Sequence, residues 1–93
     1  MKNILVVDND QITLKIVKNM LEKEGYQVVT AKDGLNALDI LKDHTPDFIF
    51  VDFIMPNVDG EMLCRIIRSI ERFKDVYLVI LSAIAAEAEI YIR

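Results

Sequence analysis

The feature that most constrains the fold is a set of short, continuous apolar runs, each followed by a polar residue. The runs and the residues after them are Ile4 to Val7 with Asp8, Phe48 to Val51 with Asp52, and Tyr77 to Leu81 with Ser82. Continuous apolar runs of this length are typical of strands that are covered on both faces, as in parallel sheets. The sequence therefore predicts a parallel sheet with polar side chains at the carboxyl ends of its strands.

Segments with helical periodicity separate these strands. Their apolar residues recur at spacings of three and four: Leu14, Val17 and Leu21, flanked by Ile16 and Met20, within residues 11–24; Leu35, Leu38 and Leu41 within residues 35–44; and Met62, Leu63, Ile66, Ile67, Ile70 and Phe73. A further strand is predicted from Tyr26 to Ala31, followed by a turn at Asp33-Gly34. The alternation of strands and helices predicts an α/β fold, a doubly wound parallel sheet with helices on both faces.

Composition narrows the class of protein. A chain of 93 residues is interpreted as a single domain over residues 1–93, and its scattered basic residues with a net charge of −4 argue against nucleic-acid binding. The one cysteine, Cys64, excludes an internal disulfide framework and a multi-thiolate zinc site. No apolar run is long enough to span a membrane and the start lacks a signal-peptide pattern, so a cytoplasmic location is expected.

The polar residues after the strands form a candidate site. In an open α/β sheet, ligands bind at the carboxyl ends of the strands. Asp8 and Asp52 could hold Mg²⁺, which is often bound by one or two carboxylates with water and phosphate oxygens. If Asp52 were also a nucleophile toward phosphorus, the product would be an acyl phosphate, and the Ser82 hydroxyl could bond to a phosphoryl oxygen.

These residues resemble a known family. Val-Val-Asp-Asn-Asp at the first strand end, the string Asp52-Phe-Ile-Met-Pro-Asn-Val-Asp-Gly60 and Leu-Ser-Ala after the fourth strand are similar to the receiver domain of two-component response regulators, which has a flavodoxin-like fold. The resemblance implies that Asp52 is the phosphoacceptor, with Asp8 and the backbone carbonyl of Ile54 as Mg²⁺ ligands. It also implies that Ser82 is the switch hydroxyl. The implied phosphodonor is a phosphohistidine on a sensor histidine kinase or a histidine phosphotransfer protein.

The chain departs from the family pattern in two places. Asn9 stands where receivers usually carry a second acid, so metal affinity should be weaker at this position. The fifth βα unit of the family, with its lysine, is not matched, and Ala83 to Arg93 is expected to start a fourth helix. Strand four would then be an exposed edge, so we expect self-association through Tyr77 to Leu81 and the terminal helix.

Two alternatives to the phosphoacceptor hypothesis stay open. Asn9 and the unmatched fifth unit are compatible with a degenerate receiver, which acts as an interaction or dimerisation module without phosphorylation. The residues from Ile4 to Thr13 also resemble the start of a haloacid-dehalogenase-like phosphatase, with Asp8 as nucleophile and Asp10 as general acid. The short chain argues against the phosphatase, and Asp10 is interpreted as a helix N-cap. A receiver would catalyse at most its own phosphorylation and dephosphorylation, so no other enzymatic activity is expected.

Overall fold

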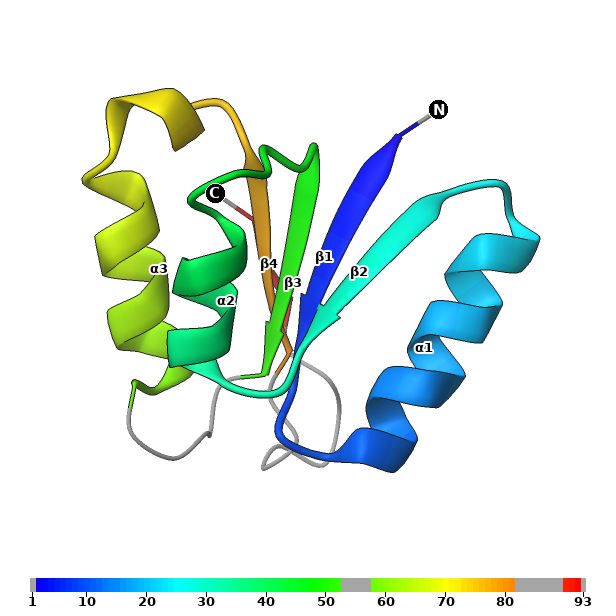
Figure 1. Cartoon of the computed structure of the whole chain (residues 1–93). Helices are drawn as coiled ribbons and strands as arrows, with labels where there is room; N and C mark the ends of the chain where they lie inside the picture. Colours follow the sequence, from blue (N-terminus) through cyan, green and yellow to red (C-terminus); the bar gives the residue numbers. More distant parts are fainter. Residues whose placement is uncertain (1, 53–57, 82–89, 93) are drawn as a thin grey trace.

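The computed structural model describes residues 2–52, 58–81 and 90–92, which form an α/β fold (Figure 1). The elements in chain order are β1 (Asn3–Val7), α1 (Gln11–Lys23), β2 (Gln27–Ala31), α2 (Gly34–Ile40), β3 (Phe48–Asp52), α3 (Gly60–Arg68), the 3₁₀ turn η1 (Glu71–Phe73), β4 (Tyr77–Leu81) and β5 (Ile90–Ile92). The predicted alternation of strands and helices is confirmed from β1 to β4.

The sheet has the strand order β2-β1-β3-β4-β5, and β1 to β4 are parallel. Leu5 of β1 pairs with Val29 of β2 and Ile49 of β3 in register. Helix α1 lies on one side of the sheet, and α2 and α3 lie on the other (Figure 1). The doubly wound parallel sheet of the flavodoxin-like type is therefore confirmed.

The chain after β4 differs from its prediction. Residues 82–89, most of the predicted terminal helix, lie outside the described segments, but Ile90–Ile92 form a strand antiparallel to β4, with Val79 paired with Ile92. The helix prediction is therefore wrong for these three residues, and so is the prediction that β4 is an unpaired edge. An isoleucine-tyrosine-isoleucine segment favours a strand, and the backbone groups along the side of β4 supply its hydrogen-bond partners.

The two faces of the sheet build two apolar clusters because successive strand residues point to opposite sides. The larger cluster, under α2 and α3, includes Leu5, Val7, Ile49, Val51, Leu63, Ile67 and Leu78. The smaller cluster, under α1, consists of Ile4, Val6, Leu14 and Val28 with half-buried neighbours. Both clusters bury β1 and β3 at the centre of the sheet, so the carboxyl ends of these strands are held by the most buried part of the fold.

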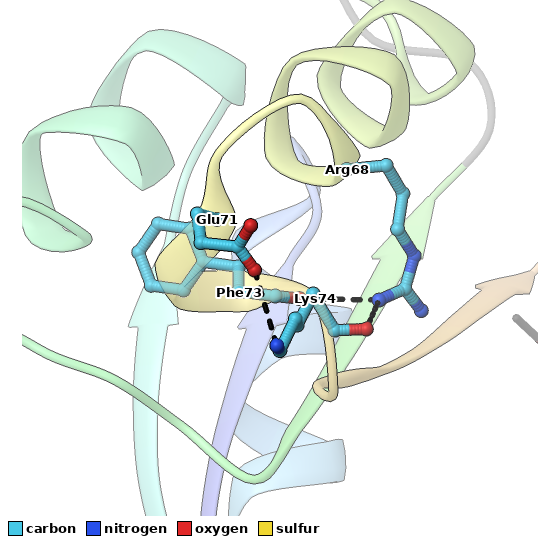
Figure 2. Close-up of polar contacts among 4 residues, drawn as sticks. All are labelled: Arg68, Glu71, Phe73 and Lys74. Carbon is cyan, nitrogen blue, oxygen red and sulfur yellow. Dashed lines mark hydrogen bonds and ion pairs between the residues drawn. The ribbon is translucent and has the colours of Figure 1, made fainter.

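The connection from α3 to β4 is held by polar contacts at the opposite end of the sheet (Figure 2). The Arg68 guanidinium donates to the carbonyl oxygens of Phe73 and Lys74, at 3.1 and 2.9 Å. Glu71 and Lys74 form an exposed ion pair at 3.2 Å. Two bonds from one guanidinium fix the turn that leads into β4, and this limits where the strand can lie.

Candidate functional site

Asp8 and Asp52 lie at the same edge of the sheet. Val7 of β1 pairs with Val51 of β3 in register, and each aspartate is the next residue of its chain. Because the two strands are parallel neighbours, both side chains emerge from the carboxyl end of the sheet, as predicted. Both residues are half-buried. The next strand also reaches this edge, because Asp52 is paired with Leu81, the residue that precedes Ser82 in the sequence.

The Asp8 carboxylate is oriented by the turn that follows β1. Its Oδ1 accepts a hydrogen bond from the backbone N–H of Asp10 at 2.9 Å. The backbone N–H of Asp8 donates to the carbonyl oxygen of Ala31 at 3.1 Å, which extends the pairing of β1 and β2 by one residue. A carboxylate has about four lone-pair positions, so a bond at Oδ1 leaves capacity for a cation.

The carboxylates of Asp8 and Asp52 fit a hard divalent cation. Within the described segments, no group of three or more His, Cys, Asp or Glu residues could hold a metal ion. A pair of carboxylates is nevertheless a sufficient set of protein ligands for Mg²⁺. The bound cation usually keeps several waters and takes further oxygen ligands from a phosphoryl group. The chemistry of this edge therefore suits Mg²⁺ together with phosphate and does not suit zinc, which prefers nitrogen and sulfur ligands.

Comparison with known proteins decides the family. The model of the response regulator receiver domain matches residues 4–92. This chain belongs to that family. It is thus a receiver domain of two-component signalling.

Its relatives include polar-differentiation response regulators DivK of Brucella ovis and Brucella suis, each 25% identical over 88 residues, which are 95% of this chain and 72% of theirs. The solved structure of the chemotaxis protein CheY4 of Vibrio cholerae is similar with a TM-score of 0.84 and 30% identity, over 87% of this chain and 68% of that one. The response regulator TrrA of Thermotoga maritima, solved in complex with Mg²⁺ and BeF, is similar with a TM-score of 0.82 and 34% identity, over 89% and 70%.

Asp10 of the receiver domain is the N-cap of α1, as predicted. Its Oδ1 accepts from the backbone N–H of Ile12 at 3.1 Å and its Oδ2 accepts from the Thr13 hydroxyl at 2.7 Å. The bond from Thr13 is the main cause that lowers the pKa of the Asp10 carboxyl below its usual value. A general acid must be protonated before it acts, so this environment argues against the phosphatase hypothesis, in which Asp10 donates the proton.

The other predicted site residues divide into two groups. Asn9 is exposed in the turn between β1 and α1, directly after Asp8. Ile54 and Ser82, the predicted carbonyl ligand and switch hydroxyl, lie outside the described segments. The structure therefore brings Asp8 and Asp52 to one edge of the sheet, and Asn9 lies next to Asp8 in the chain.

The end of the Asp52 to Gly60 string has a structural role. Asp59 is the N-cap of α3, and its Oδ1 accepts a hydrogen bond from the backbone N–H of Met62 at 2.8 Å. Cys64 on α3 is half-buried, and burial raises the pKa of its thiol to about 11 although Arg68 lowers it slightly. A neutral thiol is a poor nucleophile, and Cys64 packs against the larger apolar cluster, so it is a packing residue.

One contact near the site was missed by sequence reasoning. The Asp33-Gly34 pair was interpreted as a turn, but Gly34 is the first residue of α2 and Asp33 is its N-cap. Gly34 packs against Val58, six residues after Asp52. A helix N-cap signal at Asp33 was present in the sequence, but no local pattern could show that the glycine faces the segment after β3.

Proposed function

We propose that this receiver domain accepts a phosphoryl group on Asp52 from a phosphohistidine and changes conformation to pass on the signal. The donor is a sensor histidine kinase or a histidine phosphotransfer protein in the cytoplasm. The observation that carries the proposal is the arrangement of Asp8 and Asp52 at the ends of neighbouring parallel strands in a receiver domain. Membership of the family supports the donor class.

The proposed transfer needs one nucleophile and charge compensation. An oxygen of the Asp52 carboxylate attacks phosphorus, the phosphorus–nitrogen bond of the phosphohistidine breaks, and its electron pair goes to the imidazole nitrogen. Bound Mg²⁺ would offset the negative charge on the transferring phosphoryl group. Asp8, Asp52, the Asn9 amide oxygen and the Ile54 carbonyl are proposed to hold the cation, and the Ser82 hydroxyl to donate to a phosphoryl oxygen. The complex of the related TrrA with Mg²⁺ and BeF supports Mg²⁺ as the cation.

A small phosphodonor tests the proposal without the cognate kinase. The protein is incubated with acetyl phosphate and Mg²⁺, and its intact mass is measured, followed by mapping of the modified peptide. We expect a gain of one phosphoryl group on Asp52 that depends on Mg²⁺. No mass gain would contradict the proposal and favour the degenerate interaction module. The same assay measures the proposed catalysis, which is limited to the domain's own phosphorylation and dephosphorylation.

Asn9 provides a prediction about the cation. Asn9→Asp adds a negative charge beside Asp8, so the apparent Kd for Mg²⁺ is expected to fall about tenfold, because nearby unit charges interact by more than 1 kcal/mol near a protein surface. The measurement is a Mg²⁺ titration of phosphorylation at fixed acetyl phosphate. Asn19→Asp on the outer side of α1 is the matched control, since it adds the same charge on an exposed residue further along the helix. An equal response of the two variants would count against Asn9 as a ligand.

The side of α1 next to the site offers a surface for the phosphodonor protein. Ile12, Ile16 and Met20 recur every fourth residue and are 70%, 54% and 62% exposed. Helix α1 starts directly after Asp10, so this apolar stripe begins beside the carboxyl edge of the sheet. A contiguous patch of exposed apolar residues is typical of a protein interaction surface, whereas single exposed apolar residues are common on any protein. A protein that delivers a phosphoryl group to Asp52 must approach this edge, and we propose that it contacts the stripe.

Ile16→Glu tests this docking surface. A charge in the centre of the stripe is expected to lower the rate of transfer from a phosphorylated histidine phosphotransfer protein by about tenfold or more, because a desolvated charge without a partner disfavours the complex. Phosphorylation by acetyl phosphate should change much less. Ile70→Glu, an exposed apolar residue after α3, is the control. An equal loss of phosphorylation rate with both donors, or an equal loss in Ile16→Glu and Ile70→Glu, would contradict docking on α1.

We propose self-association through the outer strands of the sheet and no longer through β4. Because β4 pairs with β5, the outer strands of the described sheet are β2 and β5. Outer strands present unpaired backbone groups that can recruit a strand from a second molecule. Light scattering at micromolar concentration tests this proposal, and a monodisperse monomer would contradict it.

A further inference from the structure

A pocket lies at the amino end of the sheet, opposite the edge that carries Asp8 and Asp52 (the upper end of the sheet in Figure 1). It is formed where the chain enters three strands: Lys2 precedes β1, residues 45–47 precede β3, and residues 75–76 precede β4. Its volume is about 300 Å³. This volume is at the lower end of the range for pockets that bind small molecules. The proposed phosphorylation makes no use of this end of the sheet.

Part of the pocket lining is a pair of stacked aromatic rings. Phe48 and Tyr77 are the first residues of β3 and β4, and they pair in register. Their ring centroids are 5.4 Å apart, with an angle of 18° between the ring planes. Phe48 is half-buried, but Tyr77 is 53% exposed. The pair therefore presents an aromatic surface on which a flat ring of a ligand can stack.

Four charged side chains line the pocket within the described segments, and two of them are bonded to the backbone of the protein. The Asp47 carboxylate accepts a hydrogen bond at Oδ2 from the backbone N–H of Asn3 at 2.8 Å. The Arg72 guanidinium donates to the carbonyl oxygens of Leu41 and Lys42, which follow α2. These two side chains tie the segments around the pocket together, so we assign them a structural role.

The other two charged side chains, Lys2 and Asp75, are exposed and have opposite signs. Neither side chain makes an ion pair or a hydrogen bond in the part of the chain that the structure describes, and they do not pair with each other. The backbone of Lys2 is nevertheless fixed, because its carbonyl oxygen accepts from the N–H of Gln27 at 3.0 Å. An ammonium and a carboxylate that do not neutralise each other can each bind the opposite charge of a ligand.

We propose that this pocket binds a small zwitterion with a flat ring, of the chemical class of the free aromatic amino acids. The carboxylate of the ligand binds the Lys2 ammonium, its ammonium binds the Asp75 carboxylate, and its ring stacks on Tyr77. A simple aromatic acid or amine leaves one of the two protein charges unpaired, so the pocket selects against both. The site lies at the other end of the sheet from Asp52, so the inference does not depend on phosphorylation.

A titration with L-phenylalanine, followed by two-dimensional NMR, tests the site. We expect saturable shifts of the amide signals of Asp47, Val76 and Tyr77, with an apparent Kd of about 1 mM for so small a ligand. The amide signal of Asp8, at the opposite end of the sheet, should stay in place. Phenylpropionate lacks the ammonium and phenethylamine lacks the carboxylate, so each should bind about tenfold more weakly. L-Alanine keeps both charges but lacks the ring, and it should also bind more weakly.

Lys2→Gln and Asp75→Asn separate the two charge contacts. Lys2→Gln should weaken binding of L-phenylalanine about tenfold and leave binding of phenethylamine unchanged. Asp75→Asn should weaken L-phenylalanine by about the same factor and leave phenylpropionate unchanged. Lys15→Gln and Asp43→Asn are the matched controls, because they make the same changes at exposed residues that do not line the pocket. Surface substitutions of this kind rarely unfold a domain, and circular dichroism checks each variant.

Three results would overturn the inference. The first is the absence of a saturable shift at an L-phenylalanine concentration well above the expected Kd. The second is binding of phenylpropionate or phenethylamine as tight as that of L-phenylalanine, since the pocket would then recognise a single charge. The third is an equal effect of Lys2→Gln and Lys15→Gln, or of Asp75→Asn and Asp43→Asn, since binding would then follow the net charge of the protein and not the pocket.

Discussion

Replacing Asp52 by asparagine is expected to reduce phosphorylation by acetyl phosphate by at least about a thousandfold, because an amide oxygen cannot act as the nucleophile toward phosphorus. The change removes one charge but keeps the shape of the side chain at the end of β3. The measurement is the incorporated phosphoryl group per molecule, followed over time by intact mass. The circular dichroism spectra of the wild type and of Asp52→Asn should be the same, so that the loss of phosphorylation is attributed to the missing carboxylate and not to unfolding.

Asp59→Asn is the matched control for Asp52→Asn. It makes the same chemical change seven residues further along the chain, at the exposed N-cap of α3. Asparagine caps a helix about as well as aspartate, so phosphorylation should be retained. A phosphoryl group that persists on Asp8 in the Asp52→Asn protein would instead support the phosphatase hypothesis.

Leu5→Ala is expected to destabilise the fold by about 2–5 kcal/mol, because truncating a buried leucine loses transfer free energy and leaves a cavity. Leu5 is 0% exposed, in the strand between β2 and β3. A domain of this size has a total free energy of unfolding of about 5–14 kcal/mol, so the loss is a large share of it. Urea denaturation followed by circular dichroism should show a lower midpoint with a similar slope.

Leu35→Ala makes the same truncation at an exposed leucine of α2 and should change the free energy of unfolding by no more than about 0.5 kcal/mol. Equal midpoints for Leu5→Ala and Leu35→Ala would show that the centre of the sheet is not the core that stabilises the fold. Asp8 follows β1 directly, so unfolding of this strand disrupts the site. Under conditions in which Leu5→Ala is unfolded, we therefore expect phosphorylation to be lost as well.

Several features of the fold and the site followed from local sequence patterns. The apolar runs before Asp8 and Asp52 predicted parallel strands, because a strand buried on both faces needs apolar residues at every position. Asp10 was recognised as a helix N-cap because an aspartate before a helix accepts hydrogen bonds from nearby backbone N–H groups. The edge where Asp8 and Asp52 meet then followed from the geometry of parallel strands.

Other features could not be read from local patterns. Ile16 and Met20 fit an apolar helical stripe, but they are exposed because the apolar arc of α1 is wider than the part of the helix that β1 and β2 cover. The strand Ile90–Ile92 was predicted as helix, because alanine-rich sequence precedes it and its pairing with β4 depends on a distant partner.

Local sequence patterns were enough to predict the parallel sheet, the N-cap of α1 and the family string at Asp52, because each depends on residues close together in the chain. The pairing of β5 with β4, the exposure of the α1 stripe and the contact of Gly34 with Val58 are seen only in the folded chain. These features depend on which surfaces meet when the elements pack. Contacts between residues far apart in the chain cannot be predicted from local sequence patterns.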